Sequence, residues 1–254
     1  LVAGLLFRLV FLLASPNLSQ DFYRFLWDGE LVSQGFNPYL YTPNELLEQG
    51  SLVIANAQEL HMGMGELSAK HFSNYPPLNQ LLFALAAALG GKSIFGGIMV
   101  MRAIIICADL GILYFGIKLL KHLNRSSYMI FWYFLNPLVI IELTGNLHFE
   151  GVMLFFFMVS IYFIATKKWR WGGVFYALAI LTKLVPLLFL PLFLKHFGIK
   201  KSAIFYSVIG ATIIIFTLPF FTMDFVDHYS STIGLWFSNF EFNASSYNII
   251  KAIG

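Results

Sequence analysis

Two carboxylates with an arginine between them open the first polar segment of the chain. Asp21 and Asp28 are seven residues apart, which is two helical turns, so both can lie on one face if the segment is helical. Arg24 lies between them. Charges beside apolar helices are costly to desolvate and are typical of catalysis or ion handling. The alternative from these residues alone is a solvated acidic loop without a chemical role.

A single lysine lies in the middle of an apolar segment later in the chain. Lys183 follows the residues Leu178 to Thr182 and precedes Leu184 and Val185. An ammonium group in such surroundings needs an anionic partner, so Lys183 is predicted to meet a charged ligand or side chain. The alternative is a lysine that snorkels to the membrane interface.

Two further pairs of polar residues lie in or next to apolar segments. Arg102 and Asp109 are seven apart and face one way, so an ion pair inside the membrane, or a pairing with another helix, is an alternative to ligand contact. His148 and Glu150 alternate in sequence, and their side chains converge only if the backbone there is not helical. Two such residues without a third do not define a metal site. They can nevertheless line a polar cleft.

Composition decides the broad class of the protein. Hydrophobic residues make up 58% of the 254 residues, and charged residues only 11%. Soluble domains carry roughly 25% charged residues, so this is an integral membrane protein. The net charge of +3 is too small to indicate a nucleic-acid partner. Cys107 is the one cysteine, which excludes an intrachain disulfide.

The predicted fold is an all-α, multispanning transmembrane helical bundle that forms one domain over residues 1–254. A helix needs about 20 apolar residues to cross a membrane. Polar residues 15–77 form a long external loop with short interfacial helices, including an amphipathic piece over 46–60. Pro76 and Pro77 begin the next helix. The candidate spans are 1–14, 78–91, 94–120, 128–144, 150–166, 171–194 and 202–222.

Charge predicts the side of the membrane on which each loop lies. Residues 15–77 hold seven acidic and two basic residues, whereas Lys118/Lys121/Arg125, Lys167/Lys168/Arg170 and Lys195/Lys200/Lys201 form basic clusters. The positive-inside rule places the clusters in the cytoplasm and 15–77 outside. Strict alternation of full spans cannot achieve this. The conflict disappears if residues 171–181 and 185–194 form a re-entrant pair of half-length helices that turns at Thr182 and Lys183. Lys183 would then lie at the head of a water-filled cavity.

Two classes of function fit these charges. In the first, an enzyme acts on a substrate with an anionic phosphate head and a hydrophobic tail. Cationic side chains hold the phosphate, and a carboxylate takes a proton from an incoming hydroxyl. In the second, a transporter or flippase moves an anionic lipid or solute. The length of 15–77 and the lack of an internal repeat favour the enzyme.

Several sequence blocks together resemble a known family. Asp21-Phe-Tyr-Arg-Phe-Leu-Trp-Asp-Gly, Gly35-Phe-Asn-Pro-Tyr and Tyr75-Pro-Pro-Leu resemble the first external loop of bacterial GT-C glycosyltransferases, mannosyltransferases among them. These enzymes use polyprenyl-phosphate sugars. The later stretches Asn136-Pro, His148-Phe-Glu, Leu181-Thr-Lys-Leu-Val-Pro and Phe240-Glu-Phe-Asn-Ala-Ser-Ser-Tyr resemble further parts of the same pattern.

The resemblance implies a function and a site. A hexose such as mannose would pass with inversion from a polyprenyl-phosphate donor to a glycan or lipid-linked acceptor, on the external face of the bacterial plasma (inner) membrane. Family members act with or without a divalent ion, and this sequence does not choose between them. Because the chain lacks an initial Met, we expect a fragment of a longer protein. The implied catalytic residues are Asp21 and Asp28, and the implied substrate contacts are Arg24, Tyr75, Arg102, His148, Glu150 and Lys183.

Overall fold

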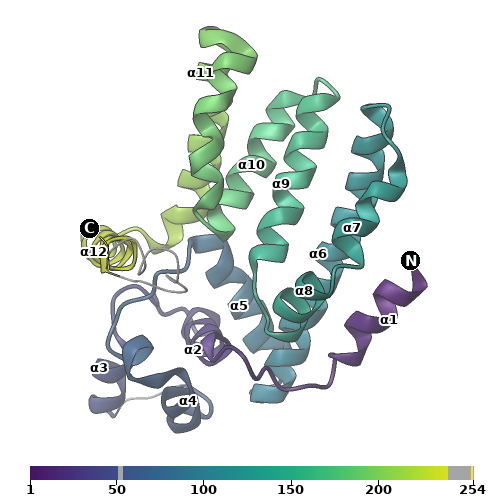
Figure 1. Cartoon of the computed structure of the whole chain (residues 1–254). Coiled ribbons are helices and arrows are strands. Elements are labelled where there is room, and N and C mark those ends of the chain that lie inside the picture. The colour runs from purple at the N-terminus through teal and green to yellow at the C-terminus, as the bar shows by residue number, and fades with distance from the viewer. Residues whose placement is uncertain (51–53, 240–252, 254) are drawn as a thin grey trace.

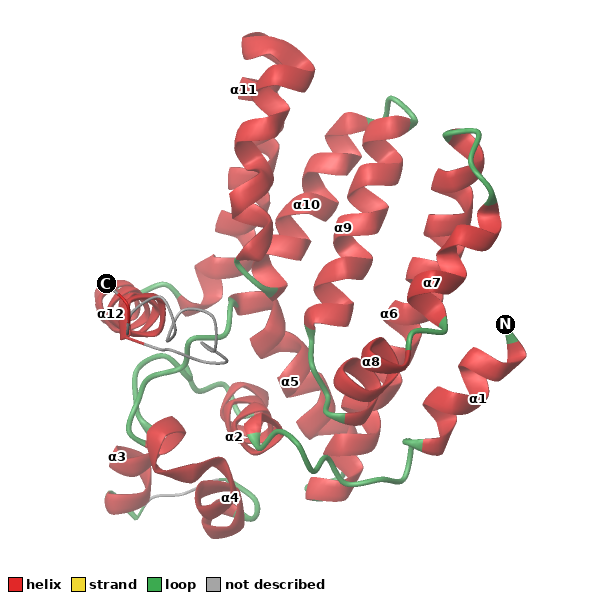
Figure 2. Cartoon of the chain, viewed as in Figure 1, coloured by secondary structure: helices red, strands yellow, loops and turns green. Residues whose placement is uncertain are grey.

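The computed structural model describes residues 1–50, 54–239 and 253, and every regular element within these ranges is helical (Figures 1 and 2). The prediction of an all-α fold is therefore confirmed. The elements are α1 (Val2–Val10), α2 (Asp21–Ser33), α3 (Pro43–Glu48), α4 (Ala57–Ala69), α5 (Pro77–Leu89), α6 (Ile94–His122), η1 (Ser127–Ile130), α7 (Phe131–Phe134), α8 (Pro137–Val139), η2 (Ile140–Gly145), α9 (Glu150–Ala165), α10 (Trp169–Thr182), η3 (Val185–Phe189), α11 (Leu190–Thr217), η4 (Leu218–Phe220) and α12 (Met223–Asn239).

The molecule consists of an upright helical bundle with a smaller group of helices across one end. Helices α6, α9, α10 and α11 pack against their neighbours in that order, while α2, α3 and α4 lie at one end near α5 (Figure 1). Within the described residues, α6 and the stretch Val185–Phe220, which is interrupted at Gly198, pass as membrane-crossing helices by length and composition. Helices α5 and α9 are apolar but shorter.

The predicted span over 128–144 is broken into four short helices. The pair Ser127–Phe134 and Pro137–Gly145 bends by 53° and would make a third span if counted as one. The bend lies where Pro137 lacks an N–H and where the Asn136 side chain accepts a bond from the Leu138 N–H at 3.0 Å. This cap starts a new helix instead of continuing the old one. The candidate span over 128–144 is therefore a bent pair of helices and not one straight helix.

The polar segment 15–77 folds into α2, α3 and α4. Thr42 and Glu45 form a reciprocal capping box that starts α3. The amphipathic piece predicted over 46–60 does not form one helix, because α3 ends at Glu48 and Gly50 adopts a left-handed φ of 66°. Helix α5 begins at Pro77, as the two prolines predict.

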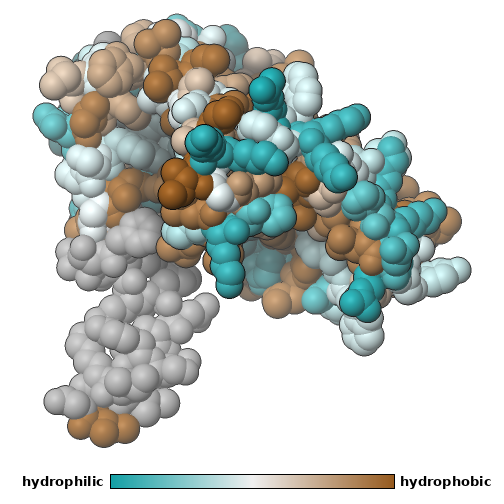
Figure 3. Space-filling model, turned by 90° about the horizontal axis from the view of Figure 1, so that it is seen from above, coloured by the Kyte–Doolittle hydropathy of each residue, from teal (hydrophilic) through white to brown (hydrophobic). Residues whose placement is uncertain are grey.

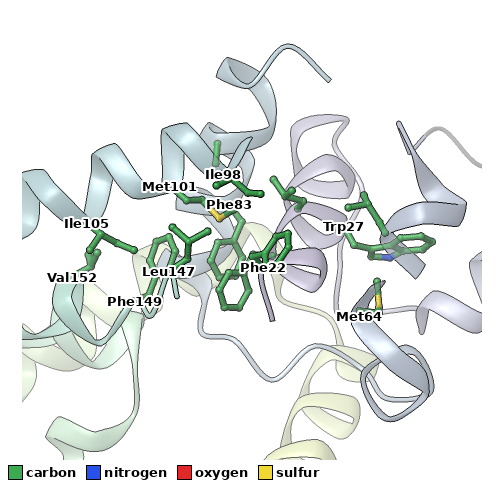
Figure 4. Close-up of a cluster of buried hydrophobic side chains, with 14 of the residues drawn as sticks. Phe22, Trp27, Met64, Phe83, Ile98, Met101, Ile105, Leu147, Phe149 and Val152 are labelled. Atoms are coloured by element: carbon green, nitrogen blue, oxygen red, sulfur yellow. The ribbon is translucent and has the colours of Figure 1, made fainter. Parts of the chain in front are cut away.

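A buried aromatic cluster holds α2 against the bundle. Phe25 of α2 stacks on Phe83 of α5 with ring centroids 4.4 Å apart, and Phe149 contacts both rings edge-on. Figure 4 shows how Phe22, Phe83 and Phe149 converge in this core. A Cβ on Gly29 would lie 2.3 Å from the Phe83 carbonyl oxygen, so glycine is needed for α2 to approach α5 this closely. The N-terminus of α2 is thereby fixed at the edge of the bundle.

The turn predicted at Thr182 and Lys183 is present. Helix α10 ends at Thr182, and Lys183 has an extended backbone with φ −149° and ψ 142°. The following helix α11 is itself interrupted at Gly198, which has φ 72°. Its two arms run antiparallel, because the Ser202 hydroxyl donates to the Phe193 carbonyl at 2.9 Å and the Tyr206 hydroxyl donates to the Leu190 carbonyl at 2.7 Å.

The three basic clusters lie at the same end of the bundle. His122 at the end of α6 contacts the Ala165 carbonyl at the end of α9, at 3.0 Å. Trp169 at the start of α10 lies 6.1 Å from the Phe197 ring, next to the Gly198 turn. The helical group of 15–77 lies at the opposite end (Figure 1). Figure 3 looks down on the basic end, where hydrophilic side chains gather among hydrophobic ones.

Candidate active site

A cavity of about 760 Å³ lies where the 15–77 segment meets the bundle. Its walls come from the approach to α2 and its first turn, from the end of α4 and the loop after it, and from the turns at His148 and Lys183. The lining residues are Pro16, Asn17, Leu18, Ser19, Gln20, Asp21, Phe22, Tyr23, Arg24, Met64, Leu67, Ser68, His71, Phe72, Asn74, Tyr75, His148 and Lys183. Segments far apart in the sequence thus meet at one polar hollow.

Asp21 is the carboxylate that opens onto this cavity. It is the first residue of α2 and is exposed, and within the described part of the chain no side chain bonds to its carboxylate. An anionic side chain is stabilised at a helix N-terminus by the helix dipole. Gln20 next to it is anchored through its amide, which donates to the Met64 carbonyl at 3.2 Å. Asp21 is therefore fixed in position but has room to bind a ligand.

Asp28 does not line the cavity, contrary to the sequence-based expectation. Its side chain is about 1% exposed and accepts bonds from Arg24 at 2.7 Å, Ser73 at 2.5 Å and Gln80 at 3.1 Å. The same Arg24 donates to the Ser68 carbonyl at 2.6 Å and the His71 carbonyl at 3.0 Å. Asp28 and Arg24 form a buried ion pair that ties α2 to the loop after α4. Arg24 borders the cavity, but this pairing already engages its guanidinium.

Arg102 also lies away from the cavity, which corrects its predicted place among the substrate contacts. It is fully buried, and its guanidinium donates to four backbone carbonyls. These belong to Leu12, Ala14, Thr144 and Gly145, at 2.8 to 3.1 Å. Arg102 therefore connects the segment that precedes Asp21 to the segment that precedes His148. It holds two walls of the cavity together.

Lys183 reaches the cavity and has an anionic partner there. Its ammonium bonds to the Glu150 carboxylate at 2.5 Å, and both side chains are about one third exposed. Antiparallel packing of α9 and α10 brings the start of α9 next to the end of α10. The buried Asn79 of α5 fixes the turn, since its amide donates to the Thr182 carbonyl at 2.8 Å. An ammonium has three donors, so Lys183 retains donors for a ligand.

His148 and Tyr75 complete the polar lining. The backbone between η2 and α9 is not helical, and Leu147 there has a φ of 61°. His148 lies 3.5 Å from the Glu142 carboxylate and lines the cavity, whereas Glu150 bonds to Lys183 but is not among the lining residues. Burial raises the pKa of Tyr75 well above its ordinary value, and the charge of Asp21 raises it further. Tyr75 is therefore a neutral donor at ordinary pH and not a base.

No group of three or more His, Cys, Asp or Glu side chains that could hold a metal ion occurs in residues 1–50, 54–239 and 253. Glu142 near His148 and Glu150 near Lys183 are each engaged in a pair. The sequence block Phe240–Tyr247, which contributed to the family resemblance, lies outside the described residues.

Sequence reasoning missed two buried residues, Arg8 and Asn79, that hold neighbouring helices of the bundle together. Asp109 pairs with Arg8 at 2.6 Å and accepts from the Tyr133 hydroxyl at 2.8 Å, so its partner is not Arg102. Arg8 lies in the first apolar segment, and a lone arginine there was a readable signal of a buried pair. Asn79 gives no comparable signal, because an amide at the start of a helix has many ordinary roles.

Comparison with protein families identifies the chain. Residues 2–197 match the family described as alpha-(1->6)-mannopyranosyltransferase, N-terminal domain. The chain belongs to this family. The resemblance to GT-C mannosyltransferases that the sequence blocks indicated is thereby confirmed. The apolar helices and the family together make the chain a membrane protein.

Three relatives of the mannopyranosyltransferase family align over long stretches. Alpha-(1->6)-mannopyranosyltransferase B of Corynebacterium glutamicum is 30% identical over 59% of this chain and 24% of its own length. The A protein of the same organism is 22% identical over 70% of this chain and 34% of its own. The A protein of Mycobacterium tuberculosis is 23% identical over 82% and 40%. The chain thus spans less than half of each relative. No solved structure matches it.

Proposed function

We propose that this chain carries the donor site of a membrane mannosyltransferase. It would move a hexose, mannose in the first instance, from a polyprenyl-phosphate donor to a glycan or lipid-linked acceptor. The family and its relatives, named as alpha-(1->6)-mannopyranosyltransferases, support the class of reaction. The single observation that carries the proposal is the cavity in which an exposed carboxylate, Asp21, and an ammonium, Lys183, line the same hollow.

The proposed chemistry is a direct displacement at the anomeric carbon. The acceptor oxygen forms a bond to that carbon while the bond from the carbon to the phosphate oxygen breaks. Asp21 takes the proton of the acceptor hydroxyl, because a positioned carboxylate within reach can act as a general base. The bonding electrons leave with the polyprenyl phosphate, and the sugar is transferred with inversion. Asp28 would support α2 and its Asp21 without touching the substrate.

Lys183 is proposed to bind the phosphate that leaves. A phosphate leaving group gains from a preorganised positive charge more than from a strong acid. The residues after Lys183 offer an apolar surface for the polyprenyl chain, since Val185, Leu187 and Leu188 are all exposed. His148 and Tyr75 supply further donors around the sugar and phosphate.

Replacement of Lys183 by methionine tests the phosphate contact. Methionine keeps most of the length and removes the charge, so donor affinity or turnover should fall roughly 10- to 150-fold, the equivalent of about 1.5–3 kcal/mol for a charge-assisted contact. Lys183→Arg should restore only part of the loss, because a flat guanidinium does not reproduce a compact ammonium. The measurement is the dependence of turnover on donor concentration. Unchanged donor kinetics in Lys183→Met would remove this residue from the site.

We also propose that the cavity faces the outside of a bacterial plasma (inner) membrane. The support is the positive-inside rule, which assigns the three basic clusters to the cytoplasm. The opposite end, with Glu48 and Glu66, then lies outside. In a variant without Cys107, a cysteine introduced by Glu48→Cys or Glu66→Cys should react with an impermeant thiol reagent added to intact cells. A cysteine introduced by Lys168→Cys should react only after the cells are opened, and the reverse pattern would overturn this orientation.

A further inference from the structure

A second hollow lies at the basic end of the bundle, opposite the cavity of Asp21. It has a volume of about 810 Å³ and lies at the α9–α10 turn. Its lining combines cations with aromatic rings and consists of Phe163, Lys167, Lys168, Trp169, Arg170, Trp171 and Phe175. None of these residues belongs to the proposed donor site.

The cations of this hollow have no counterions among the described residues. The sequence contains no Asp or Glu between residues 110 and 141 or between 151 and 223. Lys167, Lys168 and Arg170 are exposed, and within the described ranges none of them pairs with a carboxylate. Arg170 lies over the Trp169 ring, 5.4 Å from its centroid. The rim of the hollow thus carries three uncompensated positive charges.

Aromatic rings lead from the hollow toward the middle of the bundle. The rings of Phe163 and Phe175 lie 5.4 Å apart, and Phe156 lies 6.4 Å from Phe175. Trp171 is 61% exposed at the rim. Tryptophan prefers the level of lipid headgroups, and phenylalanine faces the hydrocarbon. The hollow is therefore polar at its cationic rim and apolar at its floor. A lipid shows the same change from its headgroup to its acyl chain.

We infer that this hollow binds an anionic phospholipid from the leaflet on the basic side of the membrane. Lys167, Lys168 and Arg170 would hold the phosphodiester, and the Phe163 and Phe175 rings would receive the start of an acyl chain. Basic pockets between membrane helices select anionic headgroups in this way. A soluble anion would use the cations but would leave the aromatic floor without an occupant. The chemistry therefore favours a lipid over a free phosphate.

Titration of lipid into the purified protein in neutral detergent, followed by native mass spectrometry, tests the inference. Phosphatidylglycerol should bind more tightly than phosphatidylcholine. Replacement of Lys167, Lys168 and Arg170 by glutamine should weaken phosphatidylglycerol binding roughly a hundredfold, because each cation near an anionic lipid contributes several-fold in affinity. Trp171→Ala should weaken binding of both lipids, since it removes apolar contact and no charge.

The matched control replaces Lys118, Lys121 and Arg125 by glutamine. These cations lie at the same end and carry the same charge, but they do not line the hollow. This triple variant should keep at least most of the preference for phosphatidylglycerol. Equal losses in both triple variants would show general attraction to the basic end and would overturn the site. Binding of glycerol 3-phosphate as tight as that of phosphatidylglycerol would overturn the choice of a lipid.

Discussion

Replacement of Asp21 by asparagine should lower turnover by roughly 10²–10⁴, the loss expected when a general base is removed. Asparagine keeps the shape of the side chain, and Asp21 is exposed at the first turn of α2, so the variant should fold normally. The cavity around it should still bind donor through Lys183. The fall should therefore appear in the turnover number more than in the donor concentration at half-saturation. Steady-state kinetics in reconstituted membranes separate the two.

Glu66→Gln is the matched control for Asp21→Asn. Glu66 is an exposed acid of the same 15–77 segment, and it does not line the cavity. Its replacement should leave turnover within about twofold of the unmodified protein. Near-normal turnover in a correctly inserted Asp21→Asn variant would transfer the role of base to Glu150 or another acid, and would contradict the assignment.

Replacement of Asp28 by alanine should have a different effect, a loss of stability of about 3–5 kcal/mol. The change removes the partner of Arg24 and leaves a guanidinium buried without its anion. Ser73 and Gln80 also lose their acceptor. Thermal unfolding in detergent, read by fluorescence, should show a clearly lower midpoint than for Asp21→Asn.

A double variant distinguishes the ion pair from simple loss of packing. Arg24→Met combined with Asp28→Leu removes both charges and keeps apolar volume, so it should recover part of the stability lost in Asp28→Ala. A stable Asp28→Ala protein with poor turnover would give Asp28 a direct role in the reaction. That outcome would contradict its place as a support for α2.

The sequence predicts which residues lie near this site better than it predicts which groups their side chains contact. Lys183 could be predicted as a site residue because an ammonium group in an apolar segment usually has a functional role. The turn beside it followed from the distribution of the basic clusters. The structural roles of Asp28 and Arg102 could not be predicted from the sequence. Arg24 is four residues from Asp28, but the other partners of Asp28 and those of Arg102 lie 42 to 90 residues away in the chain, and no local pattern specifies such contacts.

The helix boundaries missed from the sequence have local causes. The Asn136-Pro137 pair interrupts an apolar stretch, and hydropathy over 128–144 hides that interruption. Gly50 ends α3 within a stretch where apolar residues recur seven apart, as at Leu46, Val53 and Leu60. In both places a capping residue outweighs the hydrophobic pattern. Residues that favour turns therefore set where the helices of the polar segment and of the bundle begin and end.

Donor consumption by the protein purified into nanodiscs tests the proposed function most directly. Polyprenyl-phosphate mannose of defined chain length is supplied with a mannose-containing acceptor, and lipid products are followed by mass spectrometry. The proposal predicts release of polyprenyl phosphate in step with mannose transfer, and the loss of both in Asp21→Asn. Transfer from a nucleotide sugar while the lipid donor stays intact, or movement of the lipid across the bilayer without cleavage, would contradict it.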